Sequence, residues 1–408
     1  FTGASRWASC ESAAPGLVDS GWLHTFRSQQ LIDYVNEALK NNRDLRAAYA
    51  RLLQSRAIAR QAGADLLPQV GASVSAESAD SDSISRTEQY EAELEIAWEA
   101  DIWGRIRGQR AAAALDAVAQ SALFEFTRLS IAAQVVDTWL VVQGNQLLLN
   151  VANSEIRARR SALNDIRERV SAQALLAVDE KWGAAELARA QARQAEALQN
   201  LKASVRALEV ILGRYPSGTL PTHGSLPGLP PRVPVGLPSE LLERRPDVVA
   251  ADRLVAAAFY RKKAAKAARL PRVVLSTDLM GTSGSIANGV SGSFDGAFDP
   301  DNIVWTLAGN LIAPIVFGGR LNEEVKIQTA RQREALAVFG ATALNAFREV
   351  ENALNNEKEL RHRLAHLAQA ETNLADAINL EQQRYQEAEI DAARLDEARI
   401  RYYNVMRD

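Results

Sequence analysis

The sequence is poor in the residues that form disulfides and transition-metal sites. Its 408 residues include one cysteine, two methionines and four histidines. A single cysteine excludes an intrachain disulfide and any metal site built from several cysteines. His362 and His366 have the spacing of one helix face, but HRLAH lacks the glutamate of the HExxH zinc motif. We therefore expect no metal and no cofactor. The sequence also contains no Walker loop, dinucleotide fingerprint or nucleophile–His–acid arrangement, so no enzyme activity is expected.

Long apolar runs and an excess of charge of one sign are absent as well. The best apolar candidate, residues 129–143, is interrupted by Gln134 and Asp137, so we expect no transmembrane helix. Lys and Arg total 47 against 50 Asp and Glu, a net charge of −3, which gives no electrostatic indication of a nucleic-acid partner. The chain starts at Phe1 rather than Met, which favours a mature or trimmed product.

Proline is concentrated in one stretch that divides the chain. Seven of the 13 prolines lie in residues 213–238, which therefore form neither helix nor central strand. On either side, an Ala/Arg-rich helix ends in Leu-Pro, at Pro68 and at Pro271, and alternating segments and a further long helix follow. This similarity predicts an internal duplication. We expect an N-terminal arm at 1–30, a first repeat at 31–212, a linker at 213–238 and a second repeat at 239–408.

Segments that alternate apolar and polar residues follow each Leu-Pro, and a period of two is typical of β-strands. We expect strands at about 68–77 and 87–101 in the first repeat, and at about 271–280 and 302–313 in the second. Tyr90 and Trp98 share the apolar face of one strand, and Trp305 lies on the apolar face of the last. The opposite face of the Tyr90 strand carries carboxylates, at Glu91, Glu93, Glu95 and Glu99.

Two interpretations of this sheet are open. It could belong to a soluble protein in which other elements cover the apolar face. Alternatively, that face meets lipid, because Tyr90 and Trp98 are ~26 Å apart along a strand, close to the spacing of the aromatic girdles of membrane barrels. Four strands cannot close a membrane barrel, and an open edge cannot lie in lipid. The second interpretation therefore predicts a barrel shared between chains.

Two stretches without proline, 104–169 and 318–386, predict very long helices. Each allows ~100 Å of helix, far more than a globular core requires. In the second, Leu360, Leu364, Leu367, Leu374 and Ile378 recur at coiled-coil spacing. Shorter helices, 177–212 and 392–408, are expected to pack back on them. The predicted fold class is α+β, with long coiled-coil helices and four antiparallel strands per chain.

Several motifs then resemble one family, the TolC-like outer-membrane efflux proteins, and especially their drug-efflux branch in Gram-negative bacteria. The motifs are NRDLRAA at 42–48, WEADIWGRIR at 98–107, LERRPD at 242–247, APIVFGGRL at 313–321 and NAFREVE at 345–351. The resemblance covers about residues 28–405. It implies a homotrimer whose strands form a 12-stranded barrel and whose helices form an α-barrel in the periplasm, with the 213–238 linker in the equatorial region.

The resemblance also implies a function and partners. Members of the family form the outer-membrane exit duct of a tripartite system, together with a periplasmic adaptor and an inner-membrane pump. We expect passive conduction of small molecules such as drugs. A duct for type I protein secretion is an alternative, and so is a soluble periplasmic coiled-coil adaptor or scaffold without a pore.

A constriction at the periplasmic helix tips is a further implication. The tip motif resembles RYQEAEID at 384–391 and RLDEA at 394–398, with Ala388 where the family usually has glycine. By this resemblance Asp391, Asp396 and Glu397 line the gate, and Arg384 and Tyr385 lock it. Carboxylates of three chains in a narrow pore would attract cations. The alternative is a solvated helix end with scattered charges.

Two other sets of residues and one cysteine acquire roles through the resemblance. The acidic strand face, Glu91, Glu93, Glu95 and Glu99, is expected to line the lumen, or else is a solvated sheet face. Tyr90, Trp98 and Trp305 are expected at the membrane interface. Many drug-efflux relatives carry a lipid on an N-terminal cysteine, which makes Cys10 a candidate lipid anchor. A free thiol is the alternative there, because Trp7 does not fit a lipobox.

Overall fold

The computed structural model describes residues 21–81, 84–222, 224–229, 238–288, 290–387, 389–390 and 392–407. The chain divides into two compact units. Unit 1 takes its described residues from Phe1–Ala48, Glu125–Arg244 and Asn345–Asp408, and unit 2 comprises Tyr49–Phe124 and Arg245–Leu344. Both units therefore draw on both halves of the sequence. The boundaries predicted for the arm, the two repeats and the linker, at 1–30, 31–212, 239–408 and 213–238, stay a prediction.

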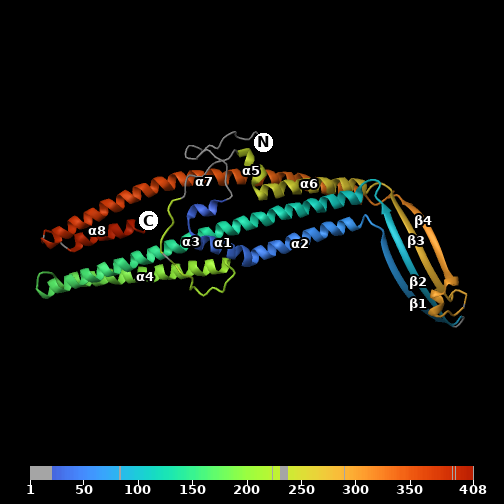
Figure 1. Ribbon diagram of the computed structural model, residues 1–408, viewed down its shortest axis with the longest axis horizontal. Coiled ribbons are helices and arrows are strands. Elements are labelled where there is room, and N and C mark those ends of the chain that lie inside the picture. Colours follow the sequence, from blue (N-terminus) through green and yellow to red (C-terminus); the bar gives the residue numbers. More distant parts are fainter. Residues whose placement is uncertain are drawn as a thin grey trace. The chain divides into compact units, whose positions relative to one another are not determined.

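The longest helices contribute residues to both units (Figure 1). Helix α3 (Arg105–Ser171) and helix α7 (Arg320–Gln386) each contain 67 residues. That length corresponds to ~100 Å of helix. Helix α2 (Arg43–Ala64) is shorter and also contributes to both units. Among the described residues, no helix is both long and apolar enough to cross a membrane.

Unit 2 contains a four-stranded antiparallel sheet and helix α6 (Pro246–Ala267). The strands are β1 (Gln69–Ser81), β2 (Ile84–Ala100), β3 (Arg272–Ser283) and β4 (Ile303–Ile312). Their order is β1-β2-β3-β4, so each strand pairs with its neighbour in sequence and β1 and β4 form the two edges. Every pairing is antiparallel.

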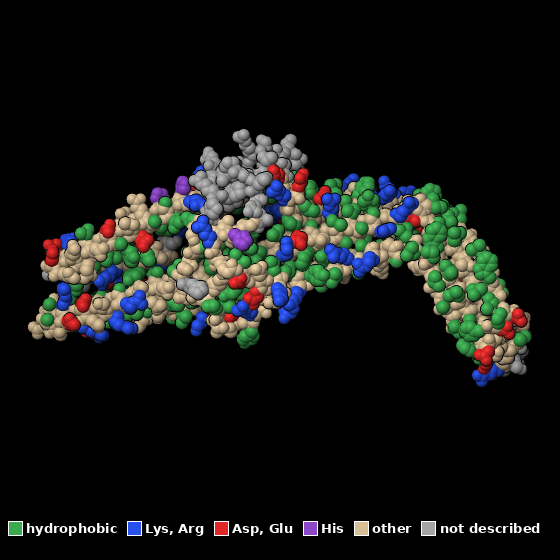
Figure 2. Space-filling model, in the orientation of Figure 1, with side chains coloured by type: hydrophobic (Ala, Val, Ile, Leu, Met, Phe, Trp, Pro, Cys, Tyr) green, Lys and Arg blue, Asp and Glu red, His purple; other side chains and the backbone are tan. Residues whose placement is uncertain are grey.

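The strand register gives the sheet one apolar and one polar face. Val70 of β1 lies opposite Ile96, and Leu275 of β3 lies opposite Trp98. The apolar face is largely uncovered by the chain, because Leu307 and Leu311 of β4 are 67% and 71% exposed. Figure 2 shows hydrophobic side chains gathered over the strands. An exposed apolar face of this extent on a folded sheet indicates a surface that contacts a membrane or another protein chain.

A chain reversal connects β2 to α3, and it explains part of the WEADIWGRIR motif. Gly104 adopts a positive φ of 74°, which favours glycine. Asp101 then caps the helix, because its carboxylate accepts hydrogen bonds from the backbone N–H groups of Ile106 (3.1 Å) and Arg107 (2.8 Å). Glu99 accepts two hydrogen bonds from Arg105, at 3.1 and 2.8 Å.

The long β3–β4 connection folds back onto one end of the sheet. It contains the short helices η3 (Asp295–Phe298) and η4 (Pro300–Asn302). Gly281 of β3 makes this approach possible, because a Cβ there would lie 2.0 Å from the carbonyl oxygen of Ala297. The ring of Phe294 meets Tyr90 edge to face, with centroids 6.1 Å apart.

Unit 1 is helical, with helix η2 (Trp22–Phe26), helix α1 (Gln29–Asn41), helix α4 (Ala177–Ile211), helix α5 (Pro238–Arg244) and helix α8 (Ala392–Val405) beside its share of α2, α3 and α7. The core contains Leu31 and Val35 of α1, Val135 of α3 and Leu208 of α4.

The NRDLRAA motif has a local structural role in this unit. The side-chain oxygen of Asn42 accepts from the N–H of Leu45 at 3.0 Å and so caps α2. Its amide donates to the carbonyl oxygen of Ile211 at 2.9 Å, which attaches the α1–α2 corner to the end of α4.

Candidate functional site

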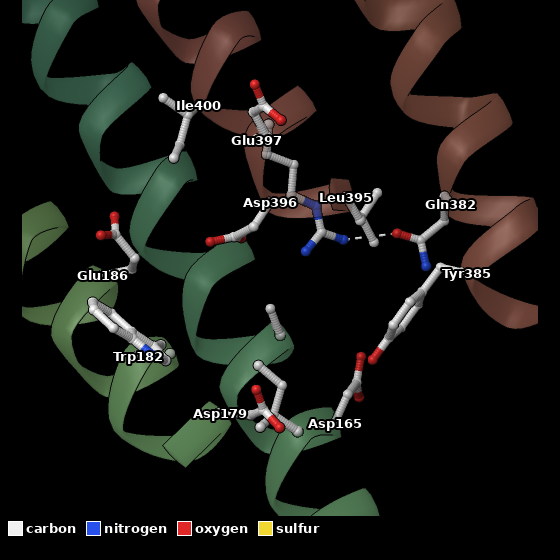
Figure 3. Close-up of a pocket in the computed structure, with 14 residues that line it drawn as sticks. Asp165, Asp179, Trp182, Glu186, Gln382, Tyr385, Leu395, Asp396, Glu397 and Ile400 are labelled. Carbon is white, nitrogen blue, oxygen red and sulfur yellow. Dashed lines mark hydrogen bonds between the residues drawn. The ribbon is translucent and has the colours of Figure 1, made fainter. Parts of the chain in front are cut away.

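The helix tips of unit 1 enclose a cavity of about 340 Å³ (Figure 3). Its walls come from the end of α3, the start of α4, the end of α7 and residues 395–400 of α8. Helix α3 turns into α4 through a short connector in which Gln173 has a φ of 60°. Asp179 of the first α4 turn accepts a hydrogen bond from the N–H of Leu176 at 2.9 Å, which fixes the start of that helix.

Tyr385 connects the tip of α7 with the tip of α3. Its side chain is only 7% exposed and lines the cavity. The guanidinium carbon of Arg169, on α3, lies 4.2 Å from the centre of the Tyr385 ring. This is a cation–π contact between two helices of the same chain. The predicted lock residue Tyr385 therefore contacts a neighbouring helix, although its role in a gate stays a prediction.

Asp396 lies at a buried cluster of charged groups rather than on an open surface. Its carboxylate accepts a hydrogen bond from Arg159 of α3, a side chain that is 2% exposed. Arg159 also lies 4.0 Å from the carboxylate of Glu155, one turn earlier on the same helix. Glu155 is in turn bound by Arg193 of α4, and Arg407 lies 3.5 Å away. The cluster links three helices through opposite charges.

The environment of Asp396 changes its acidity. Burial raises the pKa of this carboxyl, and the nearby guanidinium groups of Arg159 and Arg399 offset that effect only in part. Two nitrogens of Arg159, Nε and one terminal nitrogen, have no hydrogen-bond partner within the described part of the chain. The cluster is therefore held together mainly by charge, and it can respond to protonation of Asp396.

The remaining residues of the predicted gate have different surroundings. Glu397 is exposed and pairs with Arg401 at 2.5 Å, one turn along α8. Arg384 binds Glu389 at 3.1 Å and lies 3.8 Å from Glu381, so both of its acidic neighbours belong to its own helical hairpin. Asp391 lies outside the described residues. The structure thus brings Tyr385, Asp396 and Glu397 to one cavity, whose walls do not include Arg384.

The strand residues singled out from the sequence fall on the two faces of the sheet. Glu91, Glu93 and Glu95 share the polar face, where Ser73 donates a hydrogen bond to Glu93 at 3.3 Å and Asp278 lies opposite Glu95. Glu99, on the same face, forms the ion pair with Arg105 described above. That these carboxylates line a lumen stays a prediction.

The three aromatic residues have distinct neighbours on the other face. Tyr90 packs against Phe294, and Trp98 donates a hydrogen bond to the carbonyl oxygen of Leu66 at 2.9 Å. Trp305 pairs with Leu279, which pairs with Leu94, so its register position is midway between Tyr90 and Trp98. Their place at a membrane interface stays a prediction, and Cys10 lies outside the described residues.

Sequence reasoning missed the Glu155–Arg159 pair and Trp182. The pair carried a usable signal, because Glu155 and Arg159 are four residues apart on α3 and both are buried beside Ile156 and Leu163. Two opposite charges at helix spacing within an apolar face indicate a buried partner. Trp182, which lines the cavity although it is 67% exposed, had no comparable signal.

The cavity offers charged and aromatic side chains for interaction. Carboxylates, the guanidinium group of Arg399 and two aromatic rings surround it. Among the described residues, no group of three or more His, Cys, Asp and Glu side chains could hold a metal ion. The arrangement can hold the tip of the α3–α4 pair of helices against that of the α7–α8 pair.

Comparison with known proteins extends these observations to the whole chain. The family model described as outer membrane efflux protein matches residues 34–214 and 237–408. The pyoverdine export outer membrane protein OpmQ of Pseudomonas putida is 31% identical over 360 residues, which cover 84% of this chain and 74% of that protein. Outer membrane protein OprJ of Pseudomonas aeruginosa is 29% identical over 395 residues, covering 94% of this chain and 81% of that protein.

A solved structure gives the same result for the fold. The structure of the outer-membrane channel OprN aligns with a TM-score of 0.88 at 25% identity, covering 100% of this chain and 92% of that chain. The likeness therefore includes the sheet, the long helices and the helix tips.

Proposed function

Because the chain belongs to the outer membrane efflux protein family, we propose that it is the exit duct of a tripartite efflux system. The family consists of channel proteins, and the chain is located in the outer membrane of Gram-negative bacteria. The fold class is that of the family, with long helices of an α-barrel and four strands per chain in a barrel shared by a trimer. In our proposal, small molecules pass through this trimer without any energy supplied by the chain itself.

The observation that carries the proposal is the open sheet. Its apolar face is exposed, its other face bears carboxylates, and β1 and β4 are edges within the described chain. In lipid the backbone groups of an edge strand must be paired, because no water is available to bind them. Pairing β4 of one chain with β1 of the next satisfies both edges and encloses the polar face.

The partners in this proposal are a periplasmic adaptor and an inner-membrane pump. Since the duct has no energy source of its own, a pump has to drive the transported molecule. The match to a protein named for pyoverdine export supports an export role. The drug-efflux motifs of the sequence favour small molecules over secreted proteins as the cargo.

The gate of the duct is proposed at the α7–α8 tip, with Asp391, Asp396 and Glu397 as its acidic residues and with Arg384 and Tyr385 as its lock. Glu397 is supported by its exposure, because its carboxylate, paired with Arg401, lies on the surface of α8. Asp396 would act from inside the chain, because it faces Arg159. Tyr385 is supported by its contact with Arg169 across two helices.

Single-channel conductance in a planar bilayer tests the duct and the gate together. The purified wild-type protein is compared with Asp391→Ala/Asp396→Ala/Glu397→Ala and with the single variant Glu397→Gln. We expect a cation-selective pore whose selectivity falls in both variants, because a ring of carboxylates in a narrow pore attracts cations. Asp376→Asn, an exposed α7 carboxylate outside the cavity, is the matched control and should leave the selectivity unchanged.

The other outcomes separate the parts of the proposal. A pore that ignores the acidic substitutions would keep the duct and move the gate elsewhere. No insertion and no current in any of the proteins would reject the duct and favour a soluble scaffold.

A further inference from the structure

The end of helix α6 and its connector to β3 carry a dense positive charge. Residues 261–272 contain six Lys and Arg side chains and no Asp or Glu. Three of the six have partners inside the chain: Arg261, Lys262 and Arg272. The other three, Lys263, Lys266 and Arg269, are exposed, and their side chains form no ion pair or hydrogen bond with the part of the chain that the structure describes. Their charge is therefore available to a partner outside the chain.

This charged segment does not lie at the edge where a neighbouring chain pairs. Arg261 donates a hydrogen bond to Asp116 of α3, and Lys262 donates one to Gln332 of α7 at 2.9 Å. Helix α6 thus contacts α3 and α7 of its own chain, just as β3 lies between β2 and β4. An acidic residue of the next chain is therefore not the expected partner of the three cations.

Arg269 lines a pocket of about 340 Å³ that lies between two connectors of the same chain. One is the α6–β3 connector, which supplies Arg269, and the other is the β4–α7 turn, which supplies residues 314–319. The first turn of α7 completes the pocket with Leu321 and Asn322. Arg269 is the one charged side chain among the lining residues. The pocket therefore offers a guanidinium group among apolar walls, and a guanidinium group binds a phosphate through paired hydrogen bonds.

The β4–α7 turn exposes three consecutive apolar side chains beside this pocket. Ile315 is 88% exposed, Val316 85% and Phe317 51%. They follow Leu311 on the apolar face of β4, so the apolar surface of the sheet continues into the turn. Arg320 comes next, and its exposed guanidinium group lies 5.6 Å from the centre of the Phe317 ring. Apolar side chains with cations directly beside them suit the boundary between acyl chains and lipid headgroups, and they do not suit a water-filled lumen.

A tryptophan lies at the same level of the chain. The indole N–H of Trp103 donates a hydrogen bond to the carbonyl oxygen of Pro271 at 2.7 Å, two residues after Arg269. Its side chain is 49% exposed. Tryptophan is enriched at membrane–water interfaces, because its ring is apolar and its N–H is polar. Figure 2 shows Lys and Arg side chains gathered on the helices next to the sheet and hydrophobic side chains over the strands.

We propose that this helix–sheet junction binds the headgroup of an anionic phospholipid in the leaflet that faces the periplasm. In this proposal, which rests on the lipid-facing sheet of the function proposed above, the phosphate lies against Arg269 in the pocket. Lys263, Lys266 and Arg320 add positive charge around it. The acyl chains extend from the turn at Val316 along the apolar face of the sheet. A zwitterionic lipid fits less well, because its own ammonium group meets these cations.

Native mass spectrometry of the full-length trimer in detergent tests the site. The probes are dioleoylphosphatidylglycerol, which is anionic, and dioleoylphosphatidylcholine, which has the same acyl chains and no net charge. We expect one anionic lipid per chain, bound at least about fivefold more tightly than the zwitterionic lipid, because one basic side chain near a headgroup contributes about this factor. Lys266→Gln/Arg269→Gln should remove most of this preference.

A matched control separates the site from the overall charge of the chain. Arg333→Gln changes an exposed α7 arginine outside the pocket, ~20 Å further along the helix than Arg320. It should keep the wild-type preference. Equal losses in Arg333→Gln and in the double variant would overturn the proposal, and so would equal affinity of the wild type for the two lipids. Displacement of the anionic lipid by inorganic phosphate would assign the pocket to a free anion instead.

A substitution in the turn separates lipid from a neighbouring chain as the partner of its apolar side chains. We expect Val316→Ser to weaken the binding of both lipids and to leave the trimer intact, because only contact with acyl chains is lost. A variant that dissociates into single chains would make the turn a contact between chains and overturn its assignment to lipid.

Conductance in a planar bilayer separates this proposal from that of the duct. A conducting channel without any preference for the anionic lipid would reject the site and leave the duct intact. A trimer that prefers the anionic lipid but carries no current would keep the headgroup site and reject the duct.

Discussion

At the scale of single residues, buried polar side chains determine how unit 1 is joined. Glu209 of α4 is 2% exposed, and its carboxylate accepts three hydrogen bonds from the segment that follows the helix. The donors are the N–H of Gly218 (2.7 Å), the hydroxyl of Ser217 (2.9 Å) and the N–H of Thr219 (3.1 Å). Burial alone would raise the pKa of Glu209, but these hydrogen bonds outweigh it and the pKa is lowered.

We expect Glu209→Gln to destabilise the protein by about 1.5–3 kcal/mol at neutral pH, since hydrogen bonds to a charged acceptor are lost. The lowered pKa means that the charged form is stabilised by folding. That stabilisation is present above the usual carboxyl range and is lost as the pH falls through the lowered pKa. The difference in thermal midpoint between wild type and variant, followed by far-UV circular dichroism, should therefore shrink in acid.

The control for this residue is Glu196→Gln on the same helix, because Glu196 is exposed and should behave like wild type at every pH. A difference between Glu209→Gln and wild type that is independent of pH would contradict the role of its charge.

Some of these residues could be predicted from the sequence and others could not. The WEADIWGRIR and NRDLRAA motifs were visible, although only the structure shows that Asp101 and Asn42 cap helices. The resemblance singled out the carboxylates Asp396 and Glu397 together with Asp391. Their different surroundings depend on which face of α8 meets α3, and the spacing of charges alone does not define that face.

At the scale of elements, the end of α4 makes a very close contact with the α1–α2 corner. Gly213 follows α4 with a φ of 78°, and a Cβ there would lie 2.7 Å from the carbonyl oxygen of Asn41. Gly218 has almost the same φ, 75°, but the nearest atom to its Cβ would be 3.5 Å away on the flexible side chain of Arg206. Comparing alanine substitutions at these two glycines therefore separates the cost of backbone strain from the cost of steric contact.

We expect Gly218→Ala to cost about 1 kcal/mol, from the left-handed backbone alone. Gly213→Ala should cost roughly 1–3 kcal/mol more, because the α1–α2 corner has to move as well. Thermal unfolding of the two variants, side by side, measures the difference. Equal thermal midpoints would show that the corner yields to the added methyl group at no cost.

The elements themselves were more predictable than their contacts. Alternation predicted strands at about 87–101 and 302–313, where β2 (Ile84–Ala100) and β4 (Ile303–Ile312) lie. The loop between β3 and β4 is rich in glycine, serine and aspartate. That it folds back onto the sheet through Gly281 and Phe294 could not be predicted, because close backbone contact over a glycine leaves no periodic pattern.

At the scale of the whole molecule, neighbouring residues of β4 test which face meets lipid. Leu307 lies on the apolar face, opposite Thr277, whereas Thr306 lies on the polar face opposite Asp278. We expect Leu307→Arg to cost about 2–4 kcal/mol per chain, because a charge on the lipid face is expensive near the midplane. Thr306→Arg should be tolerated, since its charge faces an aspartate.

The measurement is the amount of folded trimer in isolated outer membranes, assessed by its resistance to dissociation in detergent. We expect Leu307→Arg to reduce it strongly and Thr306→Arg to leave it near the wild-type level. Equal losses in the two variants would contradict a lipid-facing Leu307.

The number of chains in the assembly was predictable only in part. Four strands and two open edges require other chains, and this follows from the sequence pattern once the strands are placed. The number three came from the resemblance to a family, since strand count alone does not determine how many copies close a barrel.

The strand order has a further consequence for how the channel is made. Every ladder within the chain joins strands that are neighbours in sequence, so a single chain can complete three ladders by itself. The remaining ladder exists only between chains, and its formation is a collision between molecules whose rate depends on their concentration. Until then each chain displays two bare strand edges beside an apolar surface, the combination most prone to aggregation. The time a newly exported chain spends alone is therefore its most vulnerable period.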